Sequence, residues 1–253
     1  MTELLPKTVG VVSAYVIGSI SFALIAGFIV RGVDIRDFGS RNIGATNVGR
    51  VLGRGWGWLV YFLDFGKGVV AALFLPGWIV AAFGVDWDLR RAGLYFGVCA
   101  VVGHMFPFYL RFRGGKGVAT GSGMLLAILP MPAMIAAGLW AFSLVVFRYM
   151  ALSSIIAALS VPFSIVLLER HEFWRDEREI FLVTILMTVL VVARHSANIG
   201  RMLDGTENRI GGDLQHPSTG GVTSNGNGHG NGAHSGDSTP RRATGRHPRE
   251  GRG

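Results

Sequence analysis

The chain has little charge and almost no cysteine for its length. Only 16% of its 253 residues are charged, 50% are hydrophobic, and the mean hydropathy is +0.42. With so little charge, the apolar side chains are expected to face lipid as well as a protein core. The single cysteine, Cys99, lies within an apolar run, which excludes a disulfide within the chain and a cysteine-based metal site.

Features of nucleic-acid-binding proteins and of common soluble enzymes are also missing. The net charge is +8, but much of it lies in loops between apolar segments and in a C-terminal tail, which suits anionic lipids and anionic substrates better than nucleic acid. There is no Walker A phosphate loop and no Gly-x-Ser-x-Gly elbow. His171 and Asp176 match the His-x4-Asp pattern of acyl-CoA-dependent acyltransferases. We interpret this short match as chance, because it falls on the membrane side opposite to the motifs below.

The apolar residues gather into segments of membrane-spanning length, which predicts an all-α polytopic membrane bundle. The run 118–147 is too long for one crossing, and Pro130 and Pro132 predict a break into two short helices. Seven crossings are therefore expected: residues 9–30, 56–83, 93–110, the two halves of 118–147, 151–168 and 180–193. The first is expected to be an anchor, because no small-residue cleavage site follows it.

Seven crossings place most of the basic residues on one side of the membrane. The loops 31–55, 111–117 and 148, together with the chain from 194 onward, hold many more Arg and Lys residues than the loops of the other side. The positive-inside rule makes the richer side cytoplasmic, with the N-terminus outside and the C-terminus inside. Residues 1–210 form the expected membrane domain. The tail 211–253, rich in Gly, Asn, Ser and Arg, is expected to be disordered.

The stretch from Gly103 to Thr120 carries the clearest chemical signal. It ends in Arg-Phe-Arg-Gly-Gly-Lys-Gly before an apolar segment begins at Val118. Glycines at the start of a helix let backbone N–H groups approach an anion closely, and the helix dipole favours negative charge there. We predict that Gly114, Gly115 and Gly117 form a phosphate cradle with Lys116. The alternative is a glycine-rich turn whose basic residues mark the cytoplasmic end of a helix.

Two further polar stretches are expected on the same side. Residues 39–50 read GSRNIGATNVGR and combine hydroxyls, amides, glycines and guanidinium groups, which suit a phosphate and a polyol. Residues 194–207 read RHSANIGRMLDGTE, where His195, Asn198 and Arg201 recur every three residues and would share one helix face. A capped loop and a capping histidine are the structural alternatives.

Asp64 and Lys67 are the charges that sit inside an expected membrane segment. They are three residues apart, so they can meet on one helix face. Charges at that depth are costly and usually point into the bundle. A structural ion pair is the first interpretation, and a substrate contact is the second.

Together these stretches resemble the bacterial integral-membrane glycerol-3-phosphate acyltransferases that use acyl phosphate as donor. The resemblance runs in the family's order to about residue 210. The matching residues are Ser40 to Asn47 with Arg50, Asp64 to Gly68, Gly103 to Pro107, Gly114 to Thr120, and His195, Asn198, Arg201 and Glu207.

The resemblance implies a seven-helix enzyme of the bacterial inner membrane with its active site at the cytoplasmic face. It implies transfer of a fatty acyl group from acyl phosphate to the 1-hydroxyl of sn-glycerol 3-phosphate, giving lysophosphatidic acid and inorganic phosphate, without metal or other cofactor. Ser40, Lys116, His195 and Asn198 would be catalytic. The implied substrate-binding residues are Asn47, Arg50, Lys67, Gly114, Gly115, Gly117, Thr120, Arg201 and Glu207.

Some choices stay open at this stage. The general base is either His195 or the substrate's own phosphate. Where many family members have a serine, this chain has Ala151, so a hydroxyl contact there is either lost or supplied by Ser153 or Ser154. The competing functional class is a transporter of a phosphorylated solute, which would also use broken helices and glycine-rich helix ends.

Overall fold

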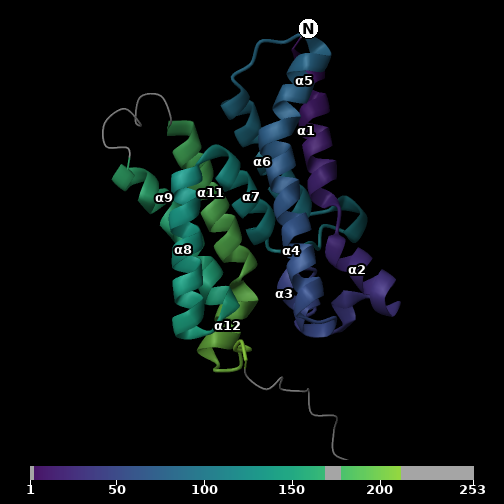
Figure 1. Cartoon of the computed structure of the whole chain (residues 1–253), viewed down its shortest axis with the longest axis vertical. Coiled ribbons are helices and arrows are strands. Elements are labelled where there is room, and N and C mark those ends of the chain that lie inside the picture. Colours follow the sequence, from purple (N-terminus) through teal and green to yellow (C-terminus); the bar gives the residue numbers. More distant parts are fainter. Residues whose placement is uncertain (1–2, 169–177, 212–253) are drawn as a thin grey trace, which may run out of the picture. The chain divides into compact units, whose positions relative to one another are not determined.

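In the computed structural model, the described residues are 3–168 and 178–211. They belong to the first of two compact units, Met1–Leu214 and Gln215–Gly253, and their regular structure is helical throughout (Figure 1). The His-x4-Asp match at His171 and Asp176 lies outside the described residues, as does the tail 211–253 apart from its first residue, Gly211.

The first expected membrane segment consists of two helices. Helix α1 (Leu4–Ser19) ends just before α2 (Phe22–Arg31), and the Ser21 side chain caps α2 by accepting from the backbone N–H of Leu24. A short 3-10 turn, η1 (Ile35–Asp37), then leads to α3 (Ala45–Val51). The capping serine explains the break, because it gives the first turn of α2 a hydrogen-bond acceptor that a continuous helix would not need.

The next two segments form the centre of the bundle. Helix α4 (Arg54–Val69) continues through a π-helical turn, η2 (Val70–Phe74), into α5 (Leu75–Phe83). Helix α6 (Leu89–Met105) is capped by Asp88 and is followed by the 3-10 turn η3 (Phe108–Leu110). Helix α6 packs against both α1 and α7 and so joins segments that are far apart in the sequence (Figure 1).

Glycines let these central helices approach closely. A Cβ at Gly68 of α4 would lie 2.0 Å from the Thr120 carbonyl oxygen, and one at Gly123 would lie 2.0 Å from that of Phe65. A Cβ at Gly103 of α6 would likewise lie 2.2 Å from the Tyr15 carbonyl oxygen. In membranes, small residues of this kind allow backbone-to-backbone packing that apolar side chains would prevent.

The remaining helices follow the predicted break at the two prolines. Helix α7 (Val118–Ile128) ends at Leu129, and α8 (Pro130–Phe147) begins with Pro130 in its first turn. Helix α9 (Met150–Leu168) packs against both α8 and α11 (Arg178–Arg194). Helix α12 (Ser196–Leu203) then turns away from α11 by 53° at His195.

By length and composition, the described residues contain fewer clear membrane-spanning stretches than the seven crossings expected, so that number stays a prediction. Among the described residues, five stretches are long and apolar enough to span a membrane, or six if the bent pair of α11 and α12 counts as one. Helix α7 has 11 residues, which is about 16 Å, roughly half the thickness of a hydrocarbon core. The break that the two prolines predict lies between α7 and α8, as expected. Helix α7, however, is too short to cross a membrane alone.

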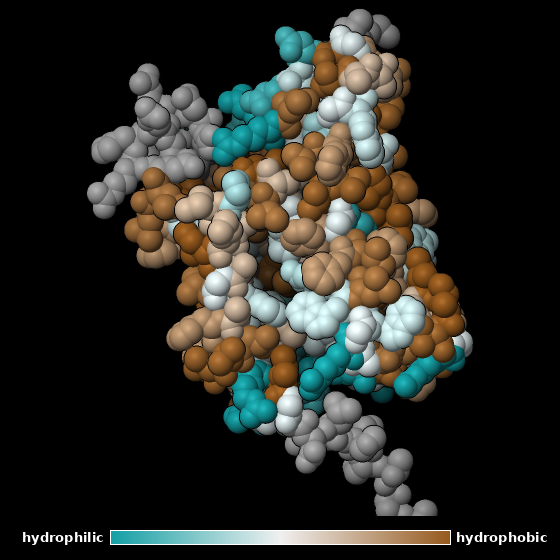
Figure 2. All heavy atoms as spheres, in the orientation of Figure 1, coloured by the Kyte–Doolittle hydropathy of each residue, from teal (hydrophilic) through white to brown (hydrophobic). Residues whose placement is uncertain are grey.

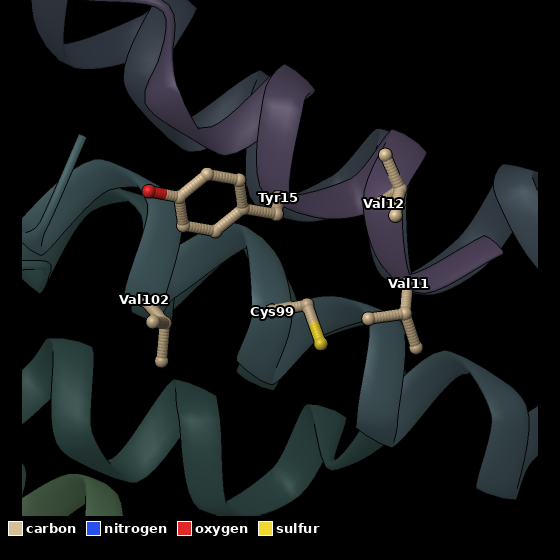
Figure 3. A pocket seen from close by; sticks show the side chains of 5 residues that line it. All are labelled: Val11, Val12, Tyr15, Cys99 and Val102. Carbon is tan, nitrogen blue, oxygen red and sulfur yellow. The ribbon is translucent and has the colours of Figure 1, made fainter. Parts of the chain in front are cut away.

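Much of the spanning surface is exposed and apolar. Only 17% of the α8 window and 39% of the Leu4–Arg31 window are buried within the protein. Figure 2 shows mainly hydrophobic side chains over the middle of one face and hydrophilic ones gathered towards its ends. A hollow of about 340 Å³ between α1 and α6 is lined by Val11, Val12, Tyr15, Cys99 and Val102 (Figure 3). These surfaces are those of an integral membrane protein, whose outer faces contact lipid.

Candidate active site

The glycine loop, residues 111–117, is clamped against the end of α6. The backbone N–H groups of Gly114 and Gly115 donate to the carbonyl oxygens of Met105 and His104, each at 3.0 Å. From the other side, the Arg194 guanidinium donates to the Gly114 carbonyl oxygen at 2.7 Å and to that of Gly115 at 3.0 Å. The loop is therefore fixed on one side by the end of α6 and on the other by Arg194.

This clamp also explains why the loop needs glycine. A Cβ at Gly114 would lie 2.1 Å from the His104 carbonyl oxygen, and one at Gly115 would lie 2.1 Å from His104 Nε2. It also corrects one part of the predicted cradle. Since the amides of Gly114 and Gly115 already donate to α6, they are not the N–H groups that would face an anion.

Within the described part of the chain, the N–H groups of the loop that stay free lie at the next two residues, Lys116 and Gly117. Gly117, at φ +80°, is the N-cap of α7, and across the described residues the N–H groups of Lys116 and Gly117 have no carbonyl partner. Burial lowers the pKa of Lys116 to about 8, which the charge of Glu207 partly opposes. Lys116 thus stays mostly protonated at neutral pH, beside the positive end of a helix.

Lys116 belongs to a hydrogen-bonded network with two residues of α12 and one that follows it. Its ammonium donates to Asn198 Oδ1, and Asn198 Nδ2 donates to Glu207 Oε1 at 2.8 Å. The second carboxylate oxygen of Glu207 accepts from Arg201 Nε at 2.7 Å. Asn198 and Glu207 are buried. Of the three residues predicted to share one helix face, Asn198 and Arg201 do so, because both reach the same carboxylate, whereas His195 is the N-cap that precedes α12.

His195 and Arg50 lie in the electrostatic field of this network. His195 is 2% exposed, and its Nδ1 lies 2.7 Å from the Val191 carbonyl oxygen. A carbonyl can only accept, so Nδ1 carries the proton in neutral His195 and Nε2 keeps a lone pair. The pKa of Arg50 is lowered, because the effect of burial outweighs the opposite effect of the negative charge on Glu207. Several cations therefore surround one carboxylate, an arrangement suited to anionic ligands.

Ser40 is held by Asn47. The backbone N–H of Ser40 donates to Asn47 Oδ1 at 2.8 Å, and Asn47 Nδ2 donates to the carbonyl oxygens of Ile35 and Phe38 at 3.0 and 3.1 Å. Asn47 is 1% exposed. Both of its amide hydrogens are used within this loop, so the geometry favours a role in shaping the loop around Ser40.

Lys67 lies in a different cluster. Its ammonium is 2.7 Å from Asp64 Oδ1, so the structural ion pair predicted from their spacing is confirmed. It also donates to the carbonyl oxygens of Gly18 and Ile20, at 3.0 and 2.8 Å, where α1 and α2 separate. Its fourth neighbour is His104 Nδ1, at 3.1 Å. Lys67 therefore ties the break in the first segment to α4 and α6.

Thr120, Ser153 and Ser154 are the remaining candidate residues. Thr120 is fully buried at the contact of α4 with α7, and no hydrogen-bond partner for its hydroxyl is found among the described residues. The hydroxyls of Ser153 and Ser154 donate to the carbonyl oxygens of Tyr149 and Met150 within their own helix. Neither hydroxyl hydrogen is thus free to replace a serine at Ala151. Among the described residues, no three His, Cys, Asp or Glu side chains are grouped so as to hold a metal ion.

Sequence reasoning missed one important residue, Arg194. In the sequence it is only one positive charge at a helix end. In the structure it fixes the glycine loop, and its guanidinium carbon lies 5.3 Å from the centre of the Phe106 ring. Its position immediately before His195 was the available signal. The contact itself joins residues about eighty positions apart, so no local pattern could have indicated it.

Fold and site together define an integral membrane protein of bundled helices, with a buried cationic site at the end of a glycine loop. The comparisons identify its family. The sequence profile of the glycerol-3-phosphate acyltransferases matches residues 8–205. The chain therefore belongs to the glycerol-3-phosphate acyltransferase family and is an acyltransferase of phospholipid synthesis that forms lysophosphatidic acid.

Curated relatives and solved structures agree. The chain is 40% identical to the glycerol-3-phosphate acyltransferase of Desulforamulus reducens, over 79% of this chain and 94% of that one. It is 41% identical to the enzyme of Salinibacter ruber, over 80% and 92% of the two chains. The crystal structure of PlsY (YgiH), an integral membrane enzyme in its glycerol 3-phosphate form, matches with a TM-score of 0.69 and 36% identity, covering 81% of this chain and 96% of that one. A lysophosphatidic acid form matches with a TM-score of 0.67.

Proposed function

We propose that this acyltransferase takes its acyl group from acyl phosphate and transfers it to the 1-hydroxyl of sn-glycerol 3-phosphate. The network of Lys116, Asn198, Glu207 and Arg201 carries the proposal, because it gathers cations around one carboxylate in a site with no nucleophilic cysteine. The relative's glycerol 3-phosphate form supports the same acceptor. An acyl phosphate is already activated, so a site that positions two phosphates requires no covalent enzyme intermediate.

In the proposed reaction the glycerol hydroxyl oxygen attacks the acyl carbon. A new C–O ester bond forms, the bond from the acyl carbon to the phosphate oxygen breaks, and inorganic phosphate leaves. Lys116 and the free N–H groups at the start of α7 stabilise the departing charge. Arg50 binds phosphate beside them, while Ser40 and Asn198 orient glycerol 3-phosphate.

The hydroxyl proton passes either to His195 or to the phosphate of the substrate. His195 is favoured as the general base, because a general base needs an unprotonated nitrogen. Its Nδ1 is engaged with the Val191 carbonyl oxygen, and its Nε2 keeps a free lone pair. His195→Ala should then lower kcat by about 10²- to 10⁴-fold at saturating substrate. Full turnover in that variant would transfer the role of base to the substrate phosphate.

We also propose the topology that the basic residues favour: N-terminus outside, active site and C-terminus at the cytoplasmic face of the bacterial inner membrane. The short helix α7 would be the seventh crossing, packed inside the bundle against α4, α6 and α8 and completed by the glycine loop. Residues 1–210 form the catalytic domain in this proposal, and residues 211–253 have no catalytic role.

The donor can be tested directly with purified protein in detergent or lipid. Glycerol 3-phosphate is supplied with palmitoyl phosphate or with palmitoyl-CoA, and lysophosphatidic acid is measured. Reactions without enzyme give the background of uncatalysed acylation. Product from palmitoyl phosphate alone is expected. Product from palmitoyl-CoA alone would overturn the donor proposal and would make His171 and Asp176 the candidate catalytic residues.

A further inference from the structure

A short segment after α12, residues 206–211, reaches from the active site to the turn between α8 and α9. We call it the strap. It begins just beyond residue 205, where the family match ends. Gly205, at φ +69°, turns the chain back, and the N–H groups of Thr206 and Glu207 both donate to the Arg201 carbonyl oxygen at 2.8 and 3.0 Å. This turn places Glu207 beside α12.

The first half of the strap determines how the Asn198 amide is oriented. Glu207 accepts from Asn198 Nδ2, which leaves Asn198 Oδ1 to accept from Lys116. An amide rotated by half a turn would present its N–H groups to the ammonium of Lys116, and two donors repel. The buried carboxylate therefore keeps the acceptor side of Asn198 towards Lys116.

The second half of the strap is fixed to the turn between α8 and α9. Ile210 and Arg148 exchange two hydrogen bonds: the Ile210 N–H donates to the Arg148 carbonyl at 2.8 Å, and Arg148 Nε donates to the Ile210 carbonyl at 3.0 Å. Beside them, Arg209 Nε donates to the Tyr149 hydroxyl at 2.8 Å, and its guanidinium lies 5.1 Å from the centre of the Tyr149 ring. Glu207 is thus held from both ends of the strap.

We propose that Arg209 and Tyr149 are positioning residues for acyl transfer. By fixing the far end of the strap, they keep the Glu207 carboxylate in contact with Asn198 and so keep Asn198 oriented towards Lys116. This inference rests on the proposed function of that site. Within the described residues, the side-chain hydrogen bonds of Lys116 and Asn198 go to each other and to Glu207, so we argue that Arg209 and Tyr149 act on catalysis through Glu207.

A positioning role and a purely structural role of Arg209 predict different results for its variants. Arg209 is exposed, and contacts between exposed groups contribute little to folding stability. The thermal unfolding temperature should therefore change little in Arg209→Gln, whereas kcat/KM should fall by about 2- to 12-fold, as for loss of one ordinary hydrogen bond. Arg209→Lys keeps a cation over the ring and should recover part of the activity.

The pH profile supplies a second readout. If the strap loosens, Lys116 loses the negative charge that partly opposes its desolvation, so the decline of kcat/KM at alkaline pH should move to lower pH. Three helices (α3, α11 and α12), the turn at His195 and the strap contribute the groups around Lys116: Arg50, Arg194, His195, Asn198, Arg201 and Glu207. The variants below leave all of them in place except where Glu207 is changed deliberately.

The experiment compares full-length wild type, Arg209→Gln, Tyr149→Phe and Glu207→Gln, with Arg31→Gln as a matched control at an exposed arginine outside the strap. Whichever donor supports wild-type turnover is used, so failure of palmitoyl phosphate contradicts only the donor proposal. Adding Arg209→Gln to Glu207→Gln should lower kcat/KM no further, because the carboxylate it positions is already gone. Should Arg209→Gln not fold, Tyr149→Phe, which removes one oxygen, takes its place in the same comparison.

Three results support the strap: loss of activity in Arg209→Gln or Tyr149→Phe but not in Arg31→Gln, an alkaline limb shifted to lower pH, and no further loss on the Glu207→Gln background. Wild-type kcat/KM and pH profile in both strap variants would overturn it. So would equal losses from Arg209→Gln with and without Glu207, because its effect would then not depend on the carboxylate.

Discussion

The sharpest prediction concerns the titration of Lys116. Burial lowers the pKa of this lysine from 10.5 to about 8, so its charge is lost as pH rises through that value. With a pKa near 8, about 90% of Lys116 is protonated at pH 7 and about 10% at pH 9. If only the ammonium form binds and stabilises phosphate, kcat/KM should fall about tenfold for each pH unit above 8.

The size of the effect follows from the contact that is lost. A hydrogen bond from a charged donor contributes about 1.5–3 kcal/mol, which corresponds to about 10- to 150-fold in kcat/KM. Lys116→Met measured at pH 7 should show nearly that whole loss, because the wild type is mostly protonated there. A phosphate monoester has its second pKa near 6, so glycerol 3-phosphate stays largely dianionic over the alkaline range and does not add its own decline.

The assay measures lysophosphatidic acid formation from pH 6.5 to 10, with rates without enzyme subtracted at each pH. Lys116→Arg keeps a charge that does not titrate in this range, so its alkaline limb should disappear even if its rate is lower. A wild-type kcat/KM that stays level to pH 9.5, or an unchanged alkaline limb in Lys116→Met, would refute the assignment of this limb to Lys116.

Two further predictions test the clamp and the buried ion pair. Gly115→Ala places a Cβ 2.1 Å from His104 Nε2, so it should displace the loop and lower kcat/KM by at least about tenfold, while Gly66→Ala, which has open space around it, should leave kcat/KM near wild type in the same assay. Lys67→Met leaves the Asp64 carboxylate buried without its cation and should destabilise the protein by about 3–5 kcal/mol in unfolding experiments. Adding Asp64→Asn should recover part of that stability, and a double variant no more stable than Lys67→Met would contradict the ion-pair explanation.

Local patterns were sufficient where the cause of a structure is local. Pro130 cannot donate a backbone hydrogen bond to the preceding turn, and a new helix begins at that residue. Asp64 and Lys67 are one helical turn apart, so their pairing within α4 follows from helix geometry. The break between α1 and α2 had a signal as well, the capping Ser21, but a serine within an apolar run does not by itself separate a cap from a buried hydroxyl.

The glycine loop shows why the rest could not be predicted. Its composition indicated glycine amides facing an anion, but two of those amides donate to the end of α6. The difference depends on how closely α6 and the loop approach, and that distance is determined by helix packing far from the loop. The Arg194 clamp has the same origin, because it exists only once α11 is packed beside the loop. Sequence therefore indicated the chemical groups of the site, and the tertiary fold determined which of their atoms remain free.

In the proposed site, Glu207 balances only part of the surrounding positive charge, and this affects how an anionic substrate would bind. Glu207 neutralises one of the cations around Lys116 and orients Asn198, but Lys116 and Arg50 retain positive charge in a partly buried setting. Such charge is costly without a counter-ion, as the lowered pKa of both groups shows. A phosphate bound there as proposed would remove that cost and raise the pKa of Lys116, so the ammonium form would persist to higher pH in the complex than in the free enzyme. The alkaline limb of kcat should therefore lie at higher pH than that of kcat/KM, because kcat reports the complex and kcat/KM the free enzyme.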